Sequence, residues 1–194
     1  MPVSTLHHWA HPEKGKAPLI TTFHHKGTRA TLPFVGFAEA FVIKAAVNAG
    51  VPRHKVRPSV EAVKEKFHGV DYALAHKCVY TDGAEILYRT LSEDEKADLT
   101  VAHTDQKQFR ATIENQLQRV HYATDGFAER VRLPKYGAKV VADPRVAGGA
   151  PVLAKGGARV KDLLDRFRAG DSEGDLAHDF GVPLSAVKEI VGAA

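Results

Sequence analysis

Two neighbouring segments in the first half of the chain, residues 34–49 and 53–68, carry apolar residues at helical spacing. Their apolar faces consist of Phe34, Phe37, Ala38, Phe41 and Ala45 in the first segment and of Val56, Val60, Val63 and Phe67 in the second. The tripeptide Gly50-Val51-Pro52 separates the segments, because glycine readily ends a helix and proline cannot continue one. We therefore expect two helices that pack into a core.

A helix-turn-helix pattern lies near the C-terminus. Its members have the spacing of two helices joined by a tight turn: Leu176, Ala177, Gly181, Val182, Leu184, Val187 and Ile190. Ala177 is small where the helices cross, and Gly181 can take the positive φ that ends the first helix. A further helix is expected over residues 160–169, ending at Gly170. Its inward face consists of Val160, Leu163, Leu164 and Phe167. Together these segments predict a three-helix unit.

The start of the chain repeats the second half of this pattern. Residues 1–9 align without gaps on residues 182–190 and place Met1, Leu6 and Trp9 at the inward positions. Met1 would then lie in the turn, with the preceding helix missing, so we expect either a natural start upstream or a degenerate copy. A looser third copy consists of Ala46, Gly50, Val51-Pro52 and Val56, so the pattern also describes any tight corner between helices.

Strand-like runs rich in Thr, Ile and Phe flank a loop that ends in glycine, which predicts a β-hairpin over residues 18–32. In a winged-helix domain, such a hairpin follows the recognition helix and contacts a second stretch of the DNA backbone. Lys26 and Arg29 are the candidate contacts of this hairpin with DNA phosphates. A second hairpin is expected over residues 74–88. The remaining expected elements are a short helix or linker at residues 92–98, a helix over 106–120 and a strand over 127–133.

Charge is unevenly distributed along the chain. The net charge is +4, but residues 1–70 hold ten Lys and Arg against four Asp and Glu, together with seven of the eleven histidines. Residues 155–194 hold six basic and seven acidic residues. Because phosphate binding depends on local clusters of cations, we expect a polyanion to bind the first segment. An uneven but solvated surface is the plain alternative.

Composition narrows the class of protein. The 194 residues are 44% hydrophobic with a mean hydropathy of −0.24, which is ordinary for a globular chain. Cys78 is the single cysteine, which excludes a disulfide or an all-cysteine metal cage within one chain. No apolar run is long enough to cross a bilayer, and no signal-like segment begins the sequence. We expect a cytoplasmic protein without a membrane partner.

Patterns that suggest catalysis or metal binding have simpler structural explanations. The glycines around Lys155 resemble a phosphate loop, but Ala154 and Gly156 stand where that motif needs glycine and a hydroxyl residue. The histidine pairs at 7–8 and 24–25, with His11, could gather a metal, yet neighbouring side chains diverge. Cys78 near His76 lacks a third positioned group, and the acidic residues do not cluster as a nuclease requires. We predict no enzyme activity, no bound metal and no cofactor.

Three stretches carry a resemblance to a known family: residues 140–152, with Asp143-Pro144-Arg145 and a glycine-proline loop, residues 165–172, and residues 176–182. They resemble the C-terminal domain of unknown function 433 found in bacterial type II toxin-antitoxin antitoxins (VapB-like), behind a MerR-like winged helix. Residues 4–9 and 41–57 also look like this family, whereas residues 92–136 match it least.

The resemblance implies a non-catalytic antitoxin that binds a PIN-like ribonuclease toxin encoded beside it and represses their shared operon. The C-terminal recognition helix offers Lys188 against Glu189, so we expect that module to contact protein and the N-terminal copy to read operator DNA. Its candidate contacts are Ser4, Thr5, His7 and His8, which face away from the inward positions. A homodimer could span two half-sites about 34 Å apart.

The expected architecture is therefore α+β and mostly α, with two winged-helix or helix-turn-helix modules. Residues 1–90 form a MerR-like winged helix whose first helix is missing, residues 91–136 a mixed connecting and dimerisation region, and residues 137–194 the module of unknown function 433. The alternative is a stand-alone MerR-like transcription regulator with a small-molecule or metal sensor in residues 70–136. A third reading is that the missing helix abolishes DNA binding.

Overall fold

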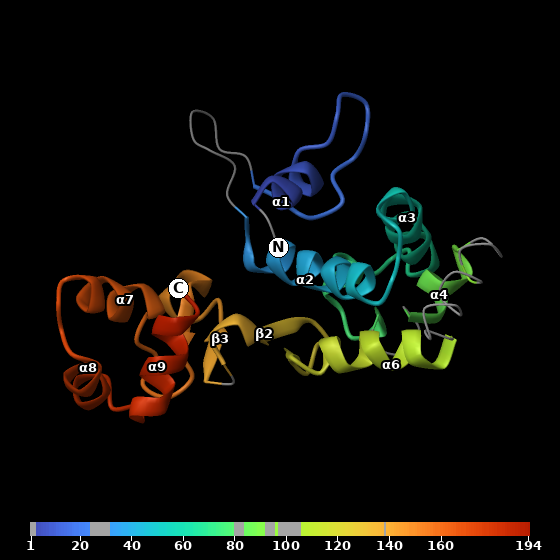
Figure 1. Ribbon diagram of the computed structural model, residues 1–194. Coiled ribbons are helices and arrows are strands. Elements are labelled where there is room, and N and C mark those ends of the chain that lie inside the picture. The colour runs from blue at the N-terminus through green and yellow to red at the C-terminus, as the bar shows by residue number, and fades with distance from the viewer. Residues whose placement is uncertain (1–2, 24–31, 80–83, 92–95, 97–105, 138) are drawn as a thin grey trace. The chain divides into compact units, whose positions relative to one another are not determined.

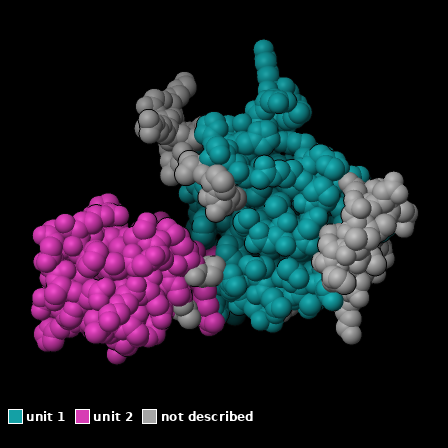
Figure 2. Space-filling model, in the orientation of Figure 1, with its two compact units in different colours: residues 1–128 teal, residues 129–194 magenta. Residues whose placement is uncertain are grey.

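The computed structural model describes residues 3–23, 32–79, 84–91, 96, 106–137 and 139–194. The chain divides into two compact units, residues 1–128 and residues 129–194, which are coloured separately in Figure 2. The boundary falls inside the predicted connecting region, residues 91–136. Each unit has its own hydrophobic core, so each is described by itself.

The first unit is built mainly from helices (Figure 1). Its elements are α1 (Val3–Ala10), α2 (Phe34–Asn48), the 3₁₀ turn η1 (Arg53–Lys55), α3 (Val56–Lys66), the 3₁₀ turn η2 (Ala73–Ala75), α4 (Ala84–Arg89), α6 (Gln106–Leu117) and strand β1 (Val120–Tyr122). The predicted helices at 34–49, 53–68 and 106–120 are confirmed, with slightly different ends. The hairpin predicted over 74–88 is wrong, because Ala73–Ala75 and Ala84–Arg89 are helical.

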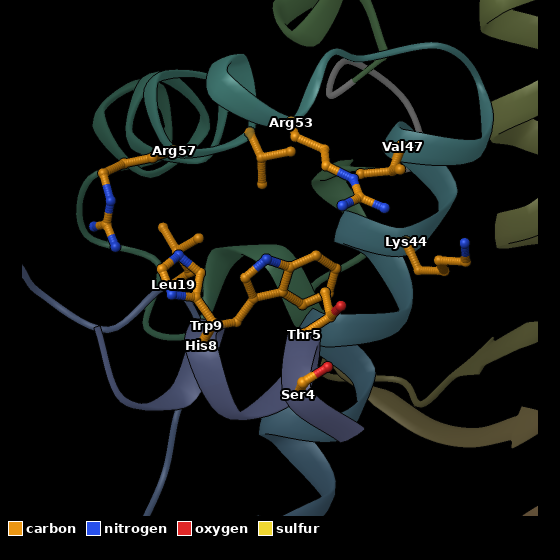
Figure 3. Close-up of a pocket in the computed structure, with 10 residues that line it drawn as sticks. Ser4, Thr5, His8, Trp9, Leu19, Lys44, Val47, Arg53 and Arg57 are labelled. Atoms are coloured by element: carbon orange, nitrogen blue, oxygen red, sulfur yellow. The ribbon is translucent and has the colours of Figure 1, made fainter. Parts of the chain in front are cut away.

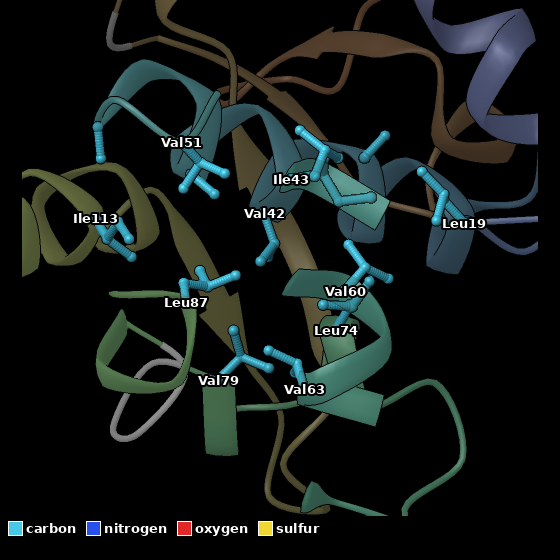
Figure 4. Close-up of a cluster of buried hydrophobic side chains, with 14 of the residues drawn as sticks. Leu19, Val42, Ile43, Val51, Val60, Val63, Leu74, Val79, Leu87 and Ile113 are labelled. Carbon is cyan, nitrogen blue, oxygen red and sulfur yellow. The ribbon is translucent and has the colours of Figure 1, made fainter. Parts of the chain in front are cut away.

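Helix α2 is the centre of the first core and packs against α6 and η2 (Figure 4). The buried side chains around it include Val42 and Ile43 of α2, Val60 and Val63 of α3, and Ile113 of α6. The predicted apolar face of α2 was only partly right. Ala38 and Ala45 are buried, but Phe34, Phe37 and Phe41 are half-buried, while Ala40, Val42 and Ile43 on the other side are inside. A helix buried on several sides has no single apolar stripe to detect.

The corner between α2 and α3 is made by one hydrogen-bonded turn. Gly50 has φ +110°, and the Val51 N–H donates back to the Ala46 carbonyl at 3.1 Å. This is a Schellman ending, in which a residue with positive φ lets the chain satisfy the last carbonyls of the helix. Pro52 then takes extended backbone angles (φ −60°, ψ 146°) immediately before η1.

The second unit combines a small sheet with three helices. Its elements are β2 (Ala128–Arg132), η4 (Pro134–Tyr136), β3 (Val140–Ala142), η5 (Ala147–Gly149), β4 (Pro151–Leu153), α7 (Val160–Arg168), α8 (Glu173–Asp179) and α9 (Leu184–Gly192). Its strands follow in the order β2-β3-β4. The antiparallel register pairs Val131 with Ala142 and Val141 with Val152. The predicted strand at 127–133 and the predicted three-helix unit are confirmed.

The predicted helix-turn-helix corner lies between α8 and α9. Gly181 has φ +61°, and the Val182 N–H donates to the Ala177 carbonyl at 3.0 Å. Leu176, Val187 and Ile190 are completely buried, as the pattern predicted. Phe167 is a correction, because it is 36% exposed and not on the inward face of α7. The corner repeats the α2–α3 turn, with Pro183 (φ −59°, ψ 145°) in the place of Pro52.

The prediction of two winged-helix modules is not confirmed. The chain is a mixture of helices and a four-stranded antiparallel sheet. Of the hairpin predicted over 18–32, residues 24–31 lie outside the described residues. Leu19 and Ile20 form a bend, and Phe23 makes a single β-bridge in place of a regular strand. The wing therefore stays a prediction.

A buried carboxylate organises the end of β3. Asp143 is 2% exposed and accepts hydrogen bonds from the Arg145 backbone N–H (3.0 Å) and from the Arg145 and Arg130 guanidinium groups (2.9 and 3.1 Å). The hydrogen bonds from Arg145 lower the pKa of Asp143 far below its ordinary value of 3.8, and those from Arg130 add to this, although burial opposes the shift. The turn at Asp143-Pro144-Arg145 is thus stabilised by the hydrogen bonds of two arginines to Asp143 as well as by the restricted backbone of proline.

Replacing Gly181 by alanine should destabilise the second unit by about 1 kcal/mol, because a positive φ strains any residue with a Cβ. No atom lies within 4 Å of the position a Cβ would take, so the cost is conformational. The matched control is Gly174→Ala inside α8, which should be neutral or stabilising because alanine favours helix. Amide hydrogen exchange of α7–α9 measures both. Equal exchange rates in the two variants would contradict the turn.

Asp143→Asn should lower the free energy of unfolding by about 1 kcal/mol at neutral pH, since both arginines are partly exposed and their charges are screened. The folded pKa of Asp143 lies below the unfolded one, so its stabilisation is complete above the ordinary value of 3.8 and is lost as the pH falls below it. The difference in the free energy of unfolding between the variant and the wild type should therefore become smaller at acidic pH. Urea unfolding at several pH values checks this. Asp71→Asn, at an exposed position, should show no such difference.

Candidate nucleic-acid interface

Helix α1 is anchored to the first unit by its C-terminal end. Trp9 and Ala10 are buried (6% and 7% exposed), and the Leu19 N–H donates to the Trp9 carbonyl at 2.9 Å. Ser4, His7 and His8 are exposed and Thr5 is half-buried. The predicted orientation away from Trp9 is only partly right, because Ser4, Thr5 and His8 line one pocket together with Trp9, and the role of these residues as DNA contacts stays a prediction.

The segment after α1 is held by groups from α2 and α3. The Thr21 N–H donates to Glu39 Oε2 (2.5 Å), and Lys64 Nζ donates to the Leu19 carbonyl (3.1 Å). Burial raises the pKa of Glu39, which is 1% exposed, although the bond from Thr21 acts against this. Gly36 allows the close approach, because a Cβ there would lie 2.0 Å from the Thr21 carbonyl oxygen.

A pocket of about 400 Å³ opens between α1 and the α2–α3 corner (Figure 3). Its polar lining comes from Ser4, Thr5 and His8 of α1 and from three cationic side chains, Lys44, Arg53 and Arg57, of α2, η1 and α3. Its apolar lining consists of Trp9, Leu19, Val47 and Val56. Three of the four predicted α1 contacts therefore face the same cavity, while His7 lies against His11 with ring centroids 4.7 Å apart.

The cations of this pocket are largely without carboxylate partners. Among the described residues, none forms an ion pair with Lys44 or Arg53. Arg57 donates to the Ala17 carbonyl at 2.8 Å and lies 3.6 Å from Glu61. Glu13, which lies near His8 and Arg57, has its pKa lowered mainly by its hydrogen bond from Lys16. Among the residues that the structure describes, the lining contains no acidic side chain, so the pocket is electropositive.

The helices of the second unit show the opposite arrangement. In α7, Lys161 pairs with Asp165, Arg166 with both Asp171 (2.6 Å) and Asp179 (2.8 Å), and Arg168 with Asp165 (3.4 Å). Arg159, just before α7, pairs with Asp162 at 2.9 Å. Because these positive charges are already matched, α7 offers few cations to a phosphate backbone.

Sequence reasoning missed Lys44, Arg53 and Arg57 as members of the site. The signal was present, because the looser copy of the turn motif at Ala46, Gly50 and Val51-Pro52 places Arg53 and Arg57 directly after the corner. Lys44 offered no such signal, since a lone lysine on an apolar helix reads as a solvated side chain. The other candidate phosphate contacts, Lys26 and Arg29, lie outside the described residues.

The patterns that suggested chemistry find structural roles. The His76 Nδ1 accepts a hydrogen bond from the backbone N–H of Cys78 (3.2 Å), and its ring packs edge-on against Phe127. The glycines around Lys155 flank strand β4, in a tight connection between β3 and α7. In the described part of the chain, no group of three or more His, Cys, Asp and Glu side chains is placed to hold a metal ion. No helix there is long and apolar enough to span a bilayer.

Comparisons with known proteins cover both units. Residues 1–60 match the family described as a putative DNA-binding HTH domain, and residues 140–192 match the protein family of unknown function DUF433. The chain is 36% identical over 212 residues to the "Putative antitoxin VapB45" of Mycobacterium tuberculosis (strain ATCC 25618 / H37Rv), covering 100% of this chain and 88% of that protein.

The crystal structure of RV2018 from Mycobacterium tuberculosis has a similar fold, with a TM-score of 0.78 and 34% sequence identity. The match covers 98% of this chain and 91% of that one. The identity of over one third along the entire length, the shared fold and the matched helix-turn-helix domain agree with one another. The chain belongs to the family of the putative antitoxin VapB45.

Proposed function

We propose that this protein is an antitoxin that binds and inhibits a PIN-like ribonuclease toxin and represses its own operon by binding operator DNA. The observation that carries the proposal is the division of charge between the units. The first unit holds Lys44 and Arg53 beside α1 without ion pairs among the described residues, whereas the cations of α7 in the second unit are already paired. The first unit binds DNA, and the second contacts protein.

The DNA-binding role rests on α1 and its surroundings. Ser4, Thr5, His7 and His8 are polar positions on a helix whose C-terminal end is anchored by the buried Trp9. A recognition helix presents such polar groups to base edges. Lys26 and Arg29 are proposed as backbone contacts beside them. A single helix this short gives modest affinity, so a homodimer that spans two half-sites about 34 Å apart is part of the proposal.

The toxin-binding role rests on the second unit. Phe167 and Leu184 are 36% and 44% exposed, and ion pairs of α7 and α8 lie on the same unit. Exposed apolar side chains bordered by paired charges are typical of protein interfaces. Occlusion of the toxin's active site by this surface would inhibit it without any chemistry by the antitoxin. The VapB45 relative, which is named an antitoxin, supports this reading.

A stand-alone transcription regulator with a small-molecule sensor is the second candidate. The pocket beside α1 favours it, because a cavity of about 400 Å³ is large enough for a small ligand. The pocket lies within residues 4–57, however, and not in residues 70–136, where the sequence suggested a sensor. Binding to the product of a neighbouring toxin gene separates the two candidates.

The DNA-binding prediction uses the internal repeat as its own control. Ser4→Ala and His7→Ala should weaken binding to the protein's own promoter region, each by about five- to a hundredfold if it contacts a base. The matched changes Ser185→Ala and Lys188→Ala, at the aligned positions of α9, should leave the affinity unchanged. Fluorescence anisotropy with labelled promoter and scrambled duplexes measures this. A loss confined to the α9 variants would reverse the assigned roles.

The toxin prediction tests the second unit. The chain should co-purify with a PIN-like protein encoded next to it and should suppress its RNA cleavage. Leu184→Asp should weaken that complex by about tenfold or more, because a charge would be buried in the interface. Tyr72→Asp, at a residue 47% exposed in the first unit, is the control and should bind normally. Failure of the wild-type chain to bind or inhibit the neighbour would favour the stand-alone regulator.

A further inference from the structure

The pocket beside α1 has a composition that a DNA contact alone does not explain. DNA phosphates bind to exposed Lys and Arg side chains and need no apolar floor. Here the cations line the same pocket as four apolar side chains, Trp9, Leu19, Val47 and Val56, which together form its apolar floor. Figure 3 shows the indole of Trp9 between α1 and the side chains that come from α2, η1 and α3. We propose that this pocket binds a small organic phosphate, with its phosphate on the cations and its apolar or aromatic body on the floor.

The size of the cavity fits such a ligand. Its volume of about 400 Å³ lies at the lower end of the range for small-molecule sites, about 300 to 1,000 Å³. Pockets of this kind combine a mainly apolar lining with a few polar groups that fix orientation. The Ser4 and Thr5 hydroxyls and the His8 imidazole provide those groups on the α1 side.

The charges select an anion. In the described part of the chain, Lys44 and Arg53 have no ion pair and no carboxylate lines the cavity. The nearby Glu13 and Glu61 are engaged by Lys16 (2.8 Å) and Arg57 (3.6 Å) at the surface. A guanidinium and an ammonium together match the several oxygens of a phosphate, and a charge-assisted hydrogen bond is stronger than a neutral one. A bound phosphate would give both cations the partner that the protein does not supply.

The same residues link the pocket to DNA, and this link rests on the proposed function. Ser4, Thr5 and His8 line the cavity and are also proposed DNA contacts. A ligand that holds these groups makes them unavailable to the major groove, so ligand and operator compete. Linkage requires the effect to be reciprocal, with DNA weakening the ligand by the same factor that the ligand weakens DNA.

Trp9 makes the test direct. It is the only tryptophan in the chain and it lines the pocket, so its fluorescence reports occupancy. The full-length protein is titrated with three compounds: AMP, adenosine, which lacks the phosphate group, and inorganic phosphate, which lacks the adenosine group. AMP should give a saturable change, and each fragment should bind about tenfold or more weakly, because each loses one half of the contacts.

Variants assign the signal to the cations. Arg53→Ala and Lys44→Ala should each weaken AMP binding by about tenfold, as expected for loss of a charge-assisted contact. Lys66→Ala, an exposed cation of α3 outside the pocket, is the matched control and should leave AMP binding unchanged. Circular dichroism checks that every variant is folded. Absence of a saturable AMP signal, equal binding of adenosine, or unchanged binding by Arg53→Ala would overturn the proposal.

A promoter duplex distinguishes the two sources of phosphate. If duplex DNA changes Trp9 fluorescence through Arg53 and Lys44 while AMP does not, the pocket takes a phosphate of the DNA backbone and the small-molecule proposal is wrong. If both bind, AMP should displace the duplex, and additive binding would overturn the competition. If the protein binds no DNA at all, the proposed function fails, yet the AMP titration still decides the ligand site.

Discussion

The geometry of one helix ending governs both halves of this protein. A glycine with positive φ followed by valine and proline stops a helix, returns a backbone N–H to a carbonyl of its last turn and starts the next helix at a fixed angle. At Gly50 this corner brings Arg53 and Arg57 to the edge of α1. At Gly181 the same corner closes the three-helix core of the second unit. Without these two turns neither the cationic pocket nor the C-terminal module would exist.

The two corners share geometry but differ in charge, and this difference separates their roles. The helix that follows Gly50 begins with positive side chains, and one of them, Arg53, forms no ion pair with the residues that the structure describes. The helix that follows Gly181 has Lys188 beside Glu189, and the helices before it pair their cations internally. A backbone motif therefore cannot by itself identify a nucleic-acid surface. The balance of charge around the motif decides which partner the surface can attract.

The sequence predicted most of the helices, since their signals are local. Helical spacing in α2, α3 and α6, and the Gly170 and Gly181 stops, depend on residues close together in the chain. The errors arose where distant contacts decide. Residues 84–89 were predicted to belong to a hairpin over residues 74–88, yet they form a helix that packs on α3 and α6. Phe167 has helical spacing with its buried neighbours but lies at the edge of the face.

The candidate site shows the same division. The exposure of Ser4, His7 and His8 followed from the inward positions of Leu6 and Trp9, which are local. The grouping of Ser4 and His8 with Lys44, Arg53 and Arg57 did not, because the cations are 36 to 53 residues away in the chain and meet α1 only through folding. Asp143 stood out in the sequence only as part of the Asp143-Pro144-Arg145 stretch that resembles the family. Its burial between two arginines, one of them on a neighbouring strand, required the sheet register.

The way the segment after α1 is attached has a consequence for how such proteins diversify. Glu39 and Lys64 form hydrogen bonds with main-chain atoms of Thr21 and Leu19. The position of the segment after α1 therefore does not depend on the identity of its polar side chains. Substitutions on the outer surface of α1 can therefore accumulate without loosening the scaffold. Duplicated genes can therefore diverge in what their products recognise while every product keeps the same main-chain hydrogen bonds that hold the segment after α1.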